Sequence, residues 1–339
     1  MPTGEITIHD IAKALNVSSS TVSRALKNNA AIGKETIRTV REMAEHLGYQ
    51  PNSMAANLRQ SRTHTVGVIV PLISRPFIAS AISGIEQVAN EAGLQVLIAQ
   101  THDDYRKEVA HAQTMFASRV EGLLVSLGNE TLQYDHFLSF EKRGIPVVGF
   151  DRVSEQIAGP RIVIDDFAAA FQMTEHLIEQ GCRRIAHLAG SQNRENYRNR
   201  LRGYTAALEQ NGFLTDESLI LYNSLSQEAG WEAARQLLNL SLPPDGIFSA
   251  NDTAAVSTIQ EIQRAGLRVP TDIAVAGFND DPVATIIQPA LTTVAYPAAQ
   301  MGQLAMQRLL AQKEKTSDVP FEAIIVPTQL LIRESSLRE

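Results

Sequence analysis

The sequence predicts a small all-α domain followed by a large α/β region that forms two doubly wound parallel-sheet lobes. Apolar residues recur at helical spacing in three short segments before residue 50. From residue 65 onward, short apolar runs alternate with amphipathic stretches, a pattern typical of parallel strands covered by helices on both faces. Some ten such units are large for one open sheet, so we divide them between two lobes.

Residues 1–49 have the pattern of three short helices. Asn16 and Val17 make a tight turn after the first helix, and Ser18 is a good N-cap for the second. A third helix closes a miniature core. The apolar positions are Ile8, Ile11, Ala12 and Leu15 in the first helix, Val22, Ala25 and Leu26 in the second, and Ile37, Val40, Ala44 and Leu47 in the third.

The second helix leaves a face of small hydroxyls and one arginine. Such a face can approach DNA closely, because serine bonds phosphates or base edges and arginine binds guanine O6 and N7 with two hydrogen bonds. We interpret it as the recognition helix of a helix-turn-helix domain; the alternative is a plain three-helix bundle with a solvated serine face. The outward-facing residues are Ser19, Ser20, Ser23 and Arg24.

The charge of the chain is divided unevenly. The formal net charge is −7, but residues 1–62 carry eight Lys/Arg against five Asp/Glu, a net of +3. The remainder carries 22 basic and 32 acidic side chains, a net of −10. A basic head on an acidic body suits a DNA-binding protein whose body limits non-specific attachment.

The composition indicates a globular protein inside the cell. Cys182 is the one cysteine, so no internal disulfide can form, which suits a reducing compartment. No apolar run reaches the roughly 18 residues of a membrane span. The polar N-terminus lacks the apolar region of a signal peptide. We therefore expect a cytoplasmic protein without membrane contact.

The α/β region begins at residue 65, after a polar connector at 50–62 that is too short and polar to be a stable helix alone. Glycines that follow the amphipathic stretches suit helix C-termini, as at Gly93 and Gly181. The expected strands are 65–70, 95–100, 122–126, 146–150, 161–165, 184–188, 246–250 and 273–277, with a last strand-like run at 323–332. The expected helices include 77–92, 106–119, 166–180, 197–210, 226–239 and 252–265.

Polar side chains follow the expected strand ends, where doubly wound sheets bind ligands. Carboxylates, amides and arginines beside an aromatic wall suit a polyol, whose hydroxyls both donate and accept. Strand-end Asp and Asn are also common N-caps, and for Asp166 and Asp252 both interpretations stay open. The candidates are Phe77, Asp151, Arg152, Arg194, Asn196, Tyr197, Arg200, Asn251, Asp252, Asn279 and Asp280.

No catalytic constellation competes with this interpretation. The sequence has no GxxxxGK[ST], GxGxxG or HExxH motif and no paired cysteines. Adjacent Asp165 and Asp166 point in different directions, so they make a poor acid/base pair. We expect no enzyme activity, no catalytic residue, no cofactor and no metal site.

Four separated motifs occur in a characteristic order and spacing. They are Val17-Ser18-x-x-Thr21-Val22-Ser23-Arg24, Leu47-Gly48-Tyr49-x-Pro51-Asn52, Ala55-x-x-Leu58 and Val66-Gly67-Val68-Ile69-Val70-Pro71. With them the chain resembles, over its whole length, the lactose/galactose repressor (LacI/GalR) family of bacterial transcription regulators.

The resemblance implies a helix-turn-helix head at 1–49, a hinge helix at 50–62, and an effector-binding and dimerisation domain at 63–339. The last would resemble a periplasmic sugar-binding protein. Its N-lobe would comprise about 63–162 and 294–324, and its C-lobe about 163–293 and 325–339. The chain would cross between the lobes near 161–164, 292–295 and 324–327.

The resemblance also assigns DNA contacts. Thr7, Ser18, Thr21 and Ser23 would hold phosphates, and Ser19, Ser20 and Arg24 would read bases in the major groove. Two copies of the hinge, with Asn52, Ala55 and Leu58, would pack in the minor groove, where Leu58 would wedge between base pairs. Lys27 and Ala56 depart from residues that are common in the family.

The implied effector site contains Asp151 and Arg200, which match the family's effector positions. Arg194 matches an arginine of purine-type members, whereas Asp151 with Arg152 looks more like the sugar type. Asn279 stands where sugar-binding members often have aspartate, and Leu225 where some use an aromatic lid. The full set implied is Phe77, Ser126, Asp151, Arg152, Arg194, Asn196, Arg200, Leu225, Asn251 and Asn279.

We therefore expect a homodimeric transcription regulator, a repressor, that binds a pseudo-palindromic operator in double-stranded DNA. A small carbohydrate effector between the lobes would control its operator affinity. A purine-responsive regulator and a transport-type sugar-binding protein are the alternatives. The chain after the last strand-like run carries no heptads for a tetramer-forming coiled coil, so a dimer is expected.

Overall fold

A computed structural model describes residues 6–49, 63–313 and 323–338 of the chain. The chain divides into two compact units, Met1–Thr63 and His64–Glu339, which are described separately. The predicted hinge contacts Asn52, Ala55 and Leu58 lie outside the described residues.

The first unit contains three helices, α1 (Ile8–Leu15), α2 (Ser19–Leu26) and α3 (Lys34–His46), which confirms the predicted pattern. Asn16 ends α1 with φ 52°, in the left-handed region that allows a tight turn. Ile11, Val22 and Val40 are fully buried where the three helices meet. The apolar spacing therefore builds the core that fixes the orientation of α2.

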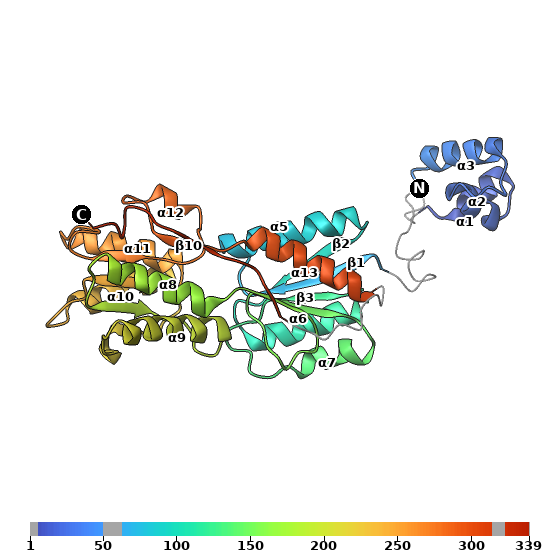
Figure 1. The fold of residues 1–339 in the computed structure, drawn as a ribbon. Helices are drawn as coiled ribbons and strands as arrows, with labels where there is room; N and C mark the ends of the chain where they lie inside the picture. The colour runs from blue at the N-terminus through green and yellow to red at the C-terminus, as the bar shows by residue number, and fades with distance from the viewer. Residues whose placement is uncertain (1–5, 50–62, 314–322, 339) are drawn as a thin grey trace. The chain divides into compact units, whose positions relative to one another are not determined.

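The second unit begins with a six-stranded parallel sheet in the order β11-β5-β4-β3-β1-β2. One face is covered by the packed pair α5 and α13, and α6 and α7 lie on the other face (Figure 1). The strands are β1 (Thr65–Val70), β2 (Gln95–Gln100), β3 (Leu123–Val125), β4 (Val147–Phe150), β5 (Arg161–Val163) and β11 (Ala323–Ile325). The helices are α5 (Pro76–Glu91), α6 (Tyr105–Ala117), α7 (Asp135–Lys142) and α13 (Ala298–Lys313).

A second parallel sheet has four strands in the order β7-β6-β8-β9. The helices pack as the pairs α8 with α9 and α10 with α11. The strands are β6 (Ile185–Leu188), β7 (Ile220–Leu221), β8 (Gly246–Ser249) and β9 (Ala274–Ala276). The helices are α8 (Asp166–Glu179), α9 (Glu195–Gln210), the 3-10 turn η1 (Glu217–Leu219), α10 (Gln227–Leu238), α11 (Asp252–Arg264) and α12 (Val283–Ile286).

The expected single strand at 323–332 is wrong. β11 joins the six-stranded sheet, whereas β12 (Gln329–Leu331) pairs antiparallel with β10 (Thr293–Ala295). Pro327 lies between them, and proline interrupts a strand because it has no N–H for the ladder. The chain passes between the two sheets after β5, after β10 and after β11, so three segments join the lobes.

Candidate DNA-reading face and ligand cleft

The exposed face of α2 carries the predicted DNA contacts. Ser18 caps the helix, and its Oγ accepts a hydrogen bond from the Thr21 N–H at 3.1 Å. The Ser18 hydroxyl also lies 2.7 Å from that of Ser20 and 2.8 Å from that of Thr21. Arg24, in the last turn of α2, is exposed. Hydroxyl groups that are hydrogen-bonded to one another can rotate and donate instead to a phosphate or a base edge.

Neighbouring residues fix the position of this face. Thr7 begins α1 in a capping box, in which its hydroxyl donates to Asp10 at 2.7 Å and its N–H donates to the same carboxylate at 2.8 Å. These bonds lower the pKa of Asp10. Ser19 Oγ lies 3.1 Å from His9 Nδ1, which joins α2 to α1. No local pattern in the sequence predicts the contact made by His9.

In the second unit, a cavity of about 490 Å³, open to solvent, lies between the two sheets. Phe77, Asp151, Arg152, Asn196, Tyr197, Arg200, Asn251 and Asn279 all line it, as predicted from the sequence. The remaining lining residues are Pro71, Leu72, Arg75, Ile78, Ala250 and Tyr296. The cavity therefore brings together side chains that come from six separate segments of the chain.

Asp151 is the central buried carboxylate of the cavity, only 9% exposed. The Tyr296 hydroxyl donates to its Oδ1 at 3.0 Å, Ser126 Oγ donates to its Oδ2 at 3.3 Å, and Asn196 Nδ2 lies 3.4 Å from Oδ1. Burial raises the pKa of Asp151, although Arg152 and Arg200 oppose the shift. A buried carboxylate held by neutral donors can exchange one of them for a ligand hydroxyl.

Arg200 forms the second charged centre and is only 2% exposed. Its Nε donates to Asp166 at 2.8 Å and its Nη1 to the Ala250 carbonyl at 2.7 Å, while its guanidinium carbon lies 3.7 Å from the centroid of the Phe278 ring. Burial raises the pKa of Asp166 to about 6 against the attraction of Arg200. Further N–H donors of this guanidinium remain for a ligand, because five are present.

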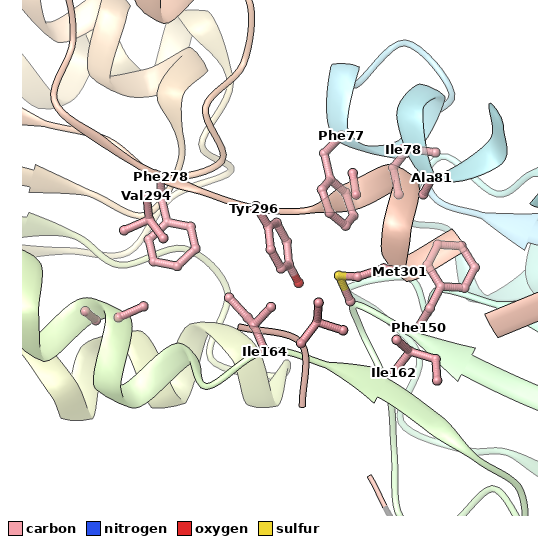
Figure 2. Packing of buried hydrophobic residues seen from close by; sticks show 14 of the residues in the cluster. Phe77, Ile78, Ala81, Phe150, Ile162, Ile164, Phe278, Val294, Tyr296 and Met301 are labelled. Atoms are coloured by element: carbon pink, nitrogen blue, oxygen red, sulfur yellow. The ribbon is translucent and has the colours of Figure 1, made fainter. Parts of the chain in front are cut away.

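Phe77 and Tyr296 supply an aromatic wall. Their rings stack at 4.3 Å between centroids with 13° between their planes. Figure 2 shows Tyr296 with its hydroxyl directed away from Phe77, in the region where the chain passes between the lobes. The wall offers an apolar surface beside the polar groups, which is the combination that a sugar ring requires.

Other predicted residues are held by protein partners. Arg152 donates to Asp103 Oδ1 at 2.7 Å and to the Tyr197 hydroxyl at 3.1 Å. Asn251 caps α11 by accepting from the Ala254 N–H at 2.9 Å, and its Nδ2 donates to the Leu225 carbonyl at 2.9 Å. These contacts order the rim of the cavity.

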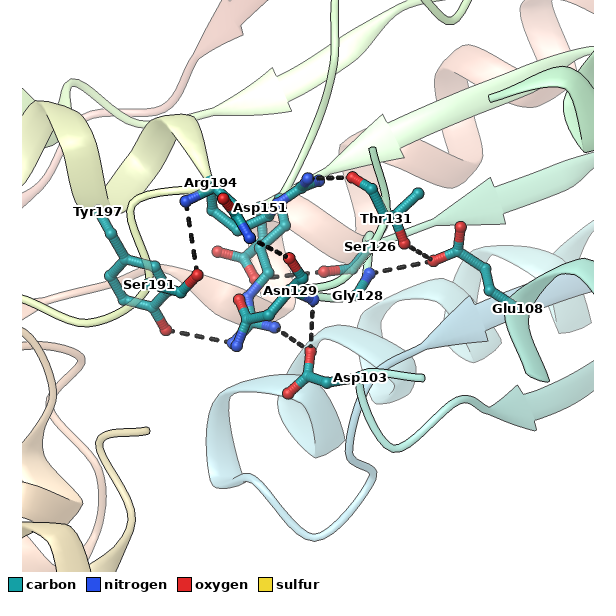
Figure 3. A network of polar contacts seen from close by, with 12 residues as sticks. Asp103, Glu108, Ser126, Gly128, Asn129, Thr131, Asp151, Ser191, Arg194 and Tyr197 are labelled. Carbon is teal, nitrogen blue, oxygen red and sulfur yellow. Dashed lines mark hydrogen bonds and ion pairs between the residues drawn. The ribbon is translucent and has the colours of Figure 1, made fainter. Parts of the chain in front are cut away.

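Ser126, Arg194 and Leu225 do not line the cavity. Ser126 contacts it through Asp151, and Leu225 through the carbonyl that Asn251 binds. Arg194 donates through Nη2 to the carbonyl of Thr131, a residue of the opposite lobe, as Figure 3 shows. Whether these three residues touch a ligand stays a prediction.

Asp166 and Asp252 do not cap their helices, because the residues before them, Asp165 and Asn251, do so. Asp252 instead accepts hydrogen bonds from Thr293 Oγ1 and from the Asp281 N–H, both at 2.7 Å. Burial raises its pKa to about 7. Both carboxylates therefore bind side-chain or backbone groups within the C-lobe. Their position after a strand could not distinguish this role from helix capping.

Strained backbone conformations gather at the cavity. Asp151, Leu225 and Asn279 have φ of 59°, 54° and 125°, values that side-chain-bearing residues rarely adopt. Asp280 (φ 57°) follows Asn279 in the sequence, and Asp103 (φ 62°) accepts a hydrogen bond from Arg152, the residue after Asp151. Such strain persists where surrounding contacts over-determine it, and it concentrates at ligand sites.

Arg75 and Tyr296 are among the lining residues that sequence reasoning missed. Arg75 precedes α5, and its Nη1 lies 3.4 Å from the Leu225 carbonyl of the other lobe. Tyr296 follows β10, 145 residues away from Asp151 in the sequence. Each is a polar or aromatic residue at the end of a strand or helix, and this position could have marked it as a candidate. No local pattern, however, indicates that Arg75 contacts Leu225 or that Tyr296 contacts Asp151.

The described residues hold neither a group of metal ligands nor a membrane-spanning helix. Within ranges 6–49, 63–313 and 323–338, no group of three or more His, Cys, Asp or Glu side chains could hold a metal ion. In the same ranges, no helix is long and apolar enough to cross a bilayer. Cys182 is buried, and burial raises the pKa of its thiol to about 11, so the thiol is suited to packing.

Comparison with known proteins agrees with both units. Residues 7–52 match the family model for bacterial regulatory proteins of the lacI family, and residues 174–336 match a periplasmic binding protein-like domain. The HTH-type transcriptional regulator DegA of Bacillus subtilis (strain 168) is 32% identical over 97% of this chain and 98% of its own length.

Two solved structures share the architecture. A complex of the transcriptional regulator CelR with cellobiose is 29% identical, with a TM-score of 0.73, and the match covers 98% of this chain and 100% of that one. The Lac repressor bound to ONPG in its repressed state is 25% identical, with a TM-score of 0.85, over 98% and 100% of the two chains. With a helix-turn-helix head, a two-lobed ligand-binding fold and full-length relatives of this kind, the protein belongs to the LacI family of bacterial transcription regulators.

Proposed function

We propose that the protein is a homodimeric repressor whose affinity for operator DNA is controlled by an uncharged carbohydrate bound between its lobes. The observation that carries the effector assignment is the buried Asp151 carboxylate, held by neutral donors beside the Phe77–Tyr296 stack. The cellobiose complex of the related CelR supports a sugar.

The charges of the cavity favour an uncharged ligand. Arg200 is paired with Asp166 and Arg152 with Asp103. An anionic effector would have to compete with these carboxylates and would lie close to Asp151. A neutral polyol instead satisfies donors and acceptors without leaving a buried charge unpaired.

The head supports DNA recognition. Arg24 and the α2 hydroxyls are presented on a rigid helix, where Thr7, Ser18, Thr21 and Ser23 would hold phosphates and Ser19, Ser20 and Arg24 would read bases. A two-fold dimer would place two such helices on a pseudo-palindrome. Asn52, Ala55 and Leu58 would add minor-groove contacts.

The proposal extends to organisation, location and activity. The lobes would divide near 162–163, 293–294 and 324–325, within two residues of the points after β5, β10 and β11 where the chain passes between the sheets. A DNA-binding role would require a cytoplasmic protein, and the full-length relative DegA, a transcriptional regulator, supports a protein without enzymatic activity. Effector binding would change lobe closure and thereby the spacing of the two hinges.

A direct test has two steps. Thermal shifts are recorded with neutral mono- and disaccharides, sugar phosphates and purines, and DNA binding is then measured on a duplex selected from a random pool. Neutral sugars should stabilise the protein and change its DNA affinity. Stabilisation by a purine or a sugar phosphate alone would contradict the proposed ligand class, and absence of a selectable duplex would contradict the proposed regulator.

A further inference from the structure

A polar network outside the ligand cavity joins the two lobes. Glu108 on α6 is fully buried, and its carboxylate accepts from the Gly128 N–H at 3.0 Å, from Thr131 Oγ1 at 2.9 Å and from His136 Nε2 at 2.9 Å. These bonds fix the loop between β3 and α7 from three directions. The loop is therefore rigid where it meets the other lobe.

Arg194 reaches this loop from the C-lobe. It is 2% exposed, lies just before α9, and donates through Nη2 to the Thr131 carbonyl (Figure 3). Beside it, Asn193 Nδ2 donates to the Asn129 carbonyl at 3.3 Å. Both acceptors are backbone atoms of the loop that Glu108 holds, so their positions depend on that carboxylate.

We propose that Arg194 is a positioning residue: its bond to the Thr131 carbonyl, on the loop that Glu108 holds, latches the lobes together and sets the equilibrium between the open and closed cleft. The inference rests on the proposed effector-controlled function. It assigns Arg194 to effector affinity without contact with the effector. Lobes that separate must break this bond and expose a buried guanidinium together with its acceptor.

The reach of the effect follows from linkage. The apparent affinity of a ligand that binds only the closed cleft is reduced by the free energy needed to close the cleft. A weaker latch raises this free energy, so it lowers the affinity for every such ligand by one common factor. A residue that touches the ligand instead discriminates between ligands. The latch thus differs from a direct contact in a measurable way.

The experiment uses the full-length protein without DNA or effector. Spin labels on Lys142→Cys and Glu209→Cys, two exposed positions on α7 and α9, report the distance between the lobes on this side. Cys182 is buried and stays unlabelled. Dilution with unlabelled chains gives one labelled chain per particle.

Arg194→Gln should shift the distance distribution to longer values, with the open-to-closed ratio raised about tenfold or more, since a charged hydrogen bond is lost. Arg194→Lys should restore part of the short distance. Arg198→Gln is the matched control, because Arg198 lies in the first turn of α9, four residues after Arg194, and donates within its own lobe, to Gln192 O at 2.9 Å. It should match the wild-type protein.

Thr131→Val removes the hydroxyl bond to Glu108 but keeps the carbonyl, and should give a smaller shift in the same direction. If Arg194→Gln does not fold, Arg194→Lys and Thr131→Val carry the test. Distributions identical to those of the wild-type protein in these variants would overturn the latch, whatever the outcome for DNA binding. For the sugars found in the thermal-shift screen, an equal loss of affinity supports the latch, and a loss confined to some sugars makes Arg194 a ligand contact and overturns it.

Discussion

The DNA-reading face and the ligand cavity place functional side chains in opposite ways. The face is a single eight-residue helix whose polar groups are exposed or half-buried and whose side-chain hydrogen bonds join residues at most ten positions apart. The cavity assembles buried groups from distant segments, with Tyr296 and Asp151 145 residues apart in the sequence and Arg75 and Leu225 150 apart.

This difference determines what a substitution does in each region. An exposed side chain of α2 can be changed with little effect on stability, because few protein groups depend on it. A buried carboxylate of the cavity balances several donors at once, so its removal changes stability and function together. The predictions below use that contrast, in order of decreasing effect.

Arg24→Ala should abolish sequence preference while leaving the stability of the protein unchanged. A bidentate arginine–guanine pair contributes roughly 1–3 kcal/mol per half-site, and a dimer makes the contact twice. Affinity is measured on selected and scrambled duplexes. Arg38→Ala, which removes an exposed arginine of α3 paired with Glu35, is the control for charge alone. Equal discrimination in wild-type protein and the Arg24 variant would place the reading residues elsewhere.

Asp252→Asn tests how a buried carboxylate makes the stability of the protein depend on pH. The pKa of Asp252 is raised from 3.8 to about 7 by burial, so its contribution to stability is fully present below about pH 4 and is lost as pH rises through about 7. The loss amounts to roughly 4 kcal/mol. Asn cannot titrate, so wild-type protein should lose stability relative to the variant between these pH values in urea unfolding.

A pH-independent difference between the two proteins would show that Asp252 does not titrate in this range. Asp166 and Asp281 also have raised pKa values, each to about 6, and contribute to the pH dependence of both proteins. The effect of Asp166 cancels in the comparison, whereas Asp281 is coupled to Asp252, so the difference reports Asp252 together with this coupling.

The contrast also separates what the sequence could predict from what it could not. Local patterns predicted the three helices α1, α2 and α3, and they predicted the eight strands β1 to β6, β8 and β9 with ends within two residues of those observed, since apolar periodicity and capping are local. The glycines after helices, such as Gly93 and Gly181, have φ of 68° and 88°, as C-terminal caps require.

Partners across the fold were not predictable in this way. The strand-end rule located eight residues of the cavity, but it could not pair Tyr296 with Asp151 or Arg194 with Thr131, because those contacts depend on how the lobes meet. Helix α13 was also missed, since it packs closely on α5 through Gly84 and Gly302, and its small residues blur the helical spacing.

Asp151→Ala and Arg200→Ala should each remove the response to sugar and leave DNA affinity without sugar unchanged. Each loses hydrogen bonds worth about 1–3 kcal/mol in a buried site. Sugar affinity is measured by calorimetry and DNA affinity by gel shift. Arg198→Ala, on the exposed side of α9, is the control and should respond normally. A normal response in both cavity variants would locate the effector elsewhere.

Ser18→Ala should have the smallest effect of these changes. It removes the N-cap bond to the Thr21 N–H and should destabilise α2 by about 1 kcal/mol. Hydrogen exchange of the α2 amides in the full-length protein measures the loss. Ser20→Ala, which removes a neighbouring hydroxyl that caps no backbone group, should leave exchange nearly unchanged; faster exchange in that variant would mean that the hydroxyl network, and not the cap, holds the helix.

The central claim is that the cavity and the DNA-reading face are coupled, and thermodynamic reciprocity tests it most directly. DNA affinity is measured with and without a saturating sugar from the thermal-shift screen, and affinity for that sugar is measured with and without the selected duplex. The two ratios should be equal and differ from one in wild-type protein, and the coupling should vanish in Asp151→Ala. A sugar that binds the cavity but leaves DNA affinity unchanged would contradict the account.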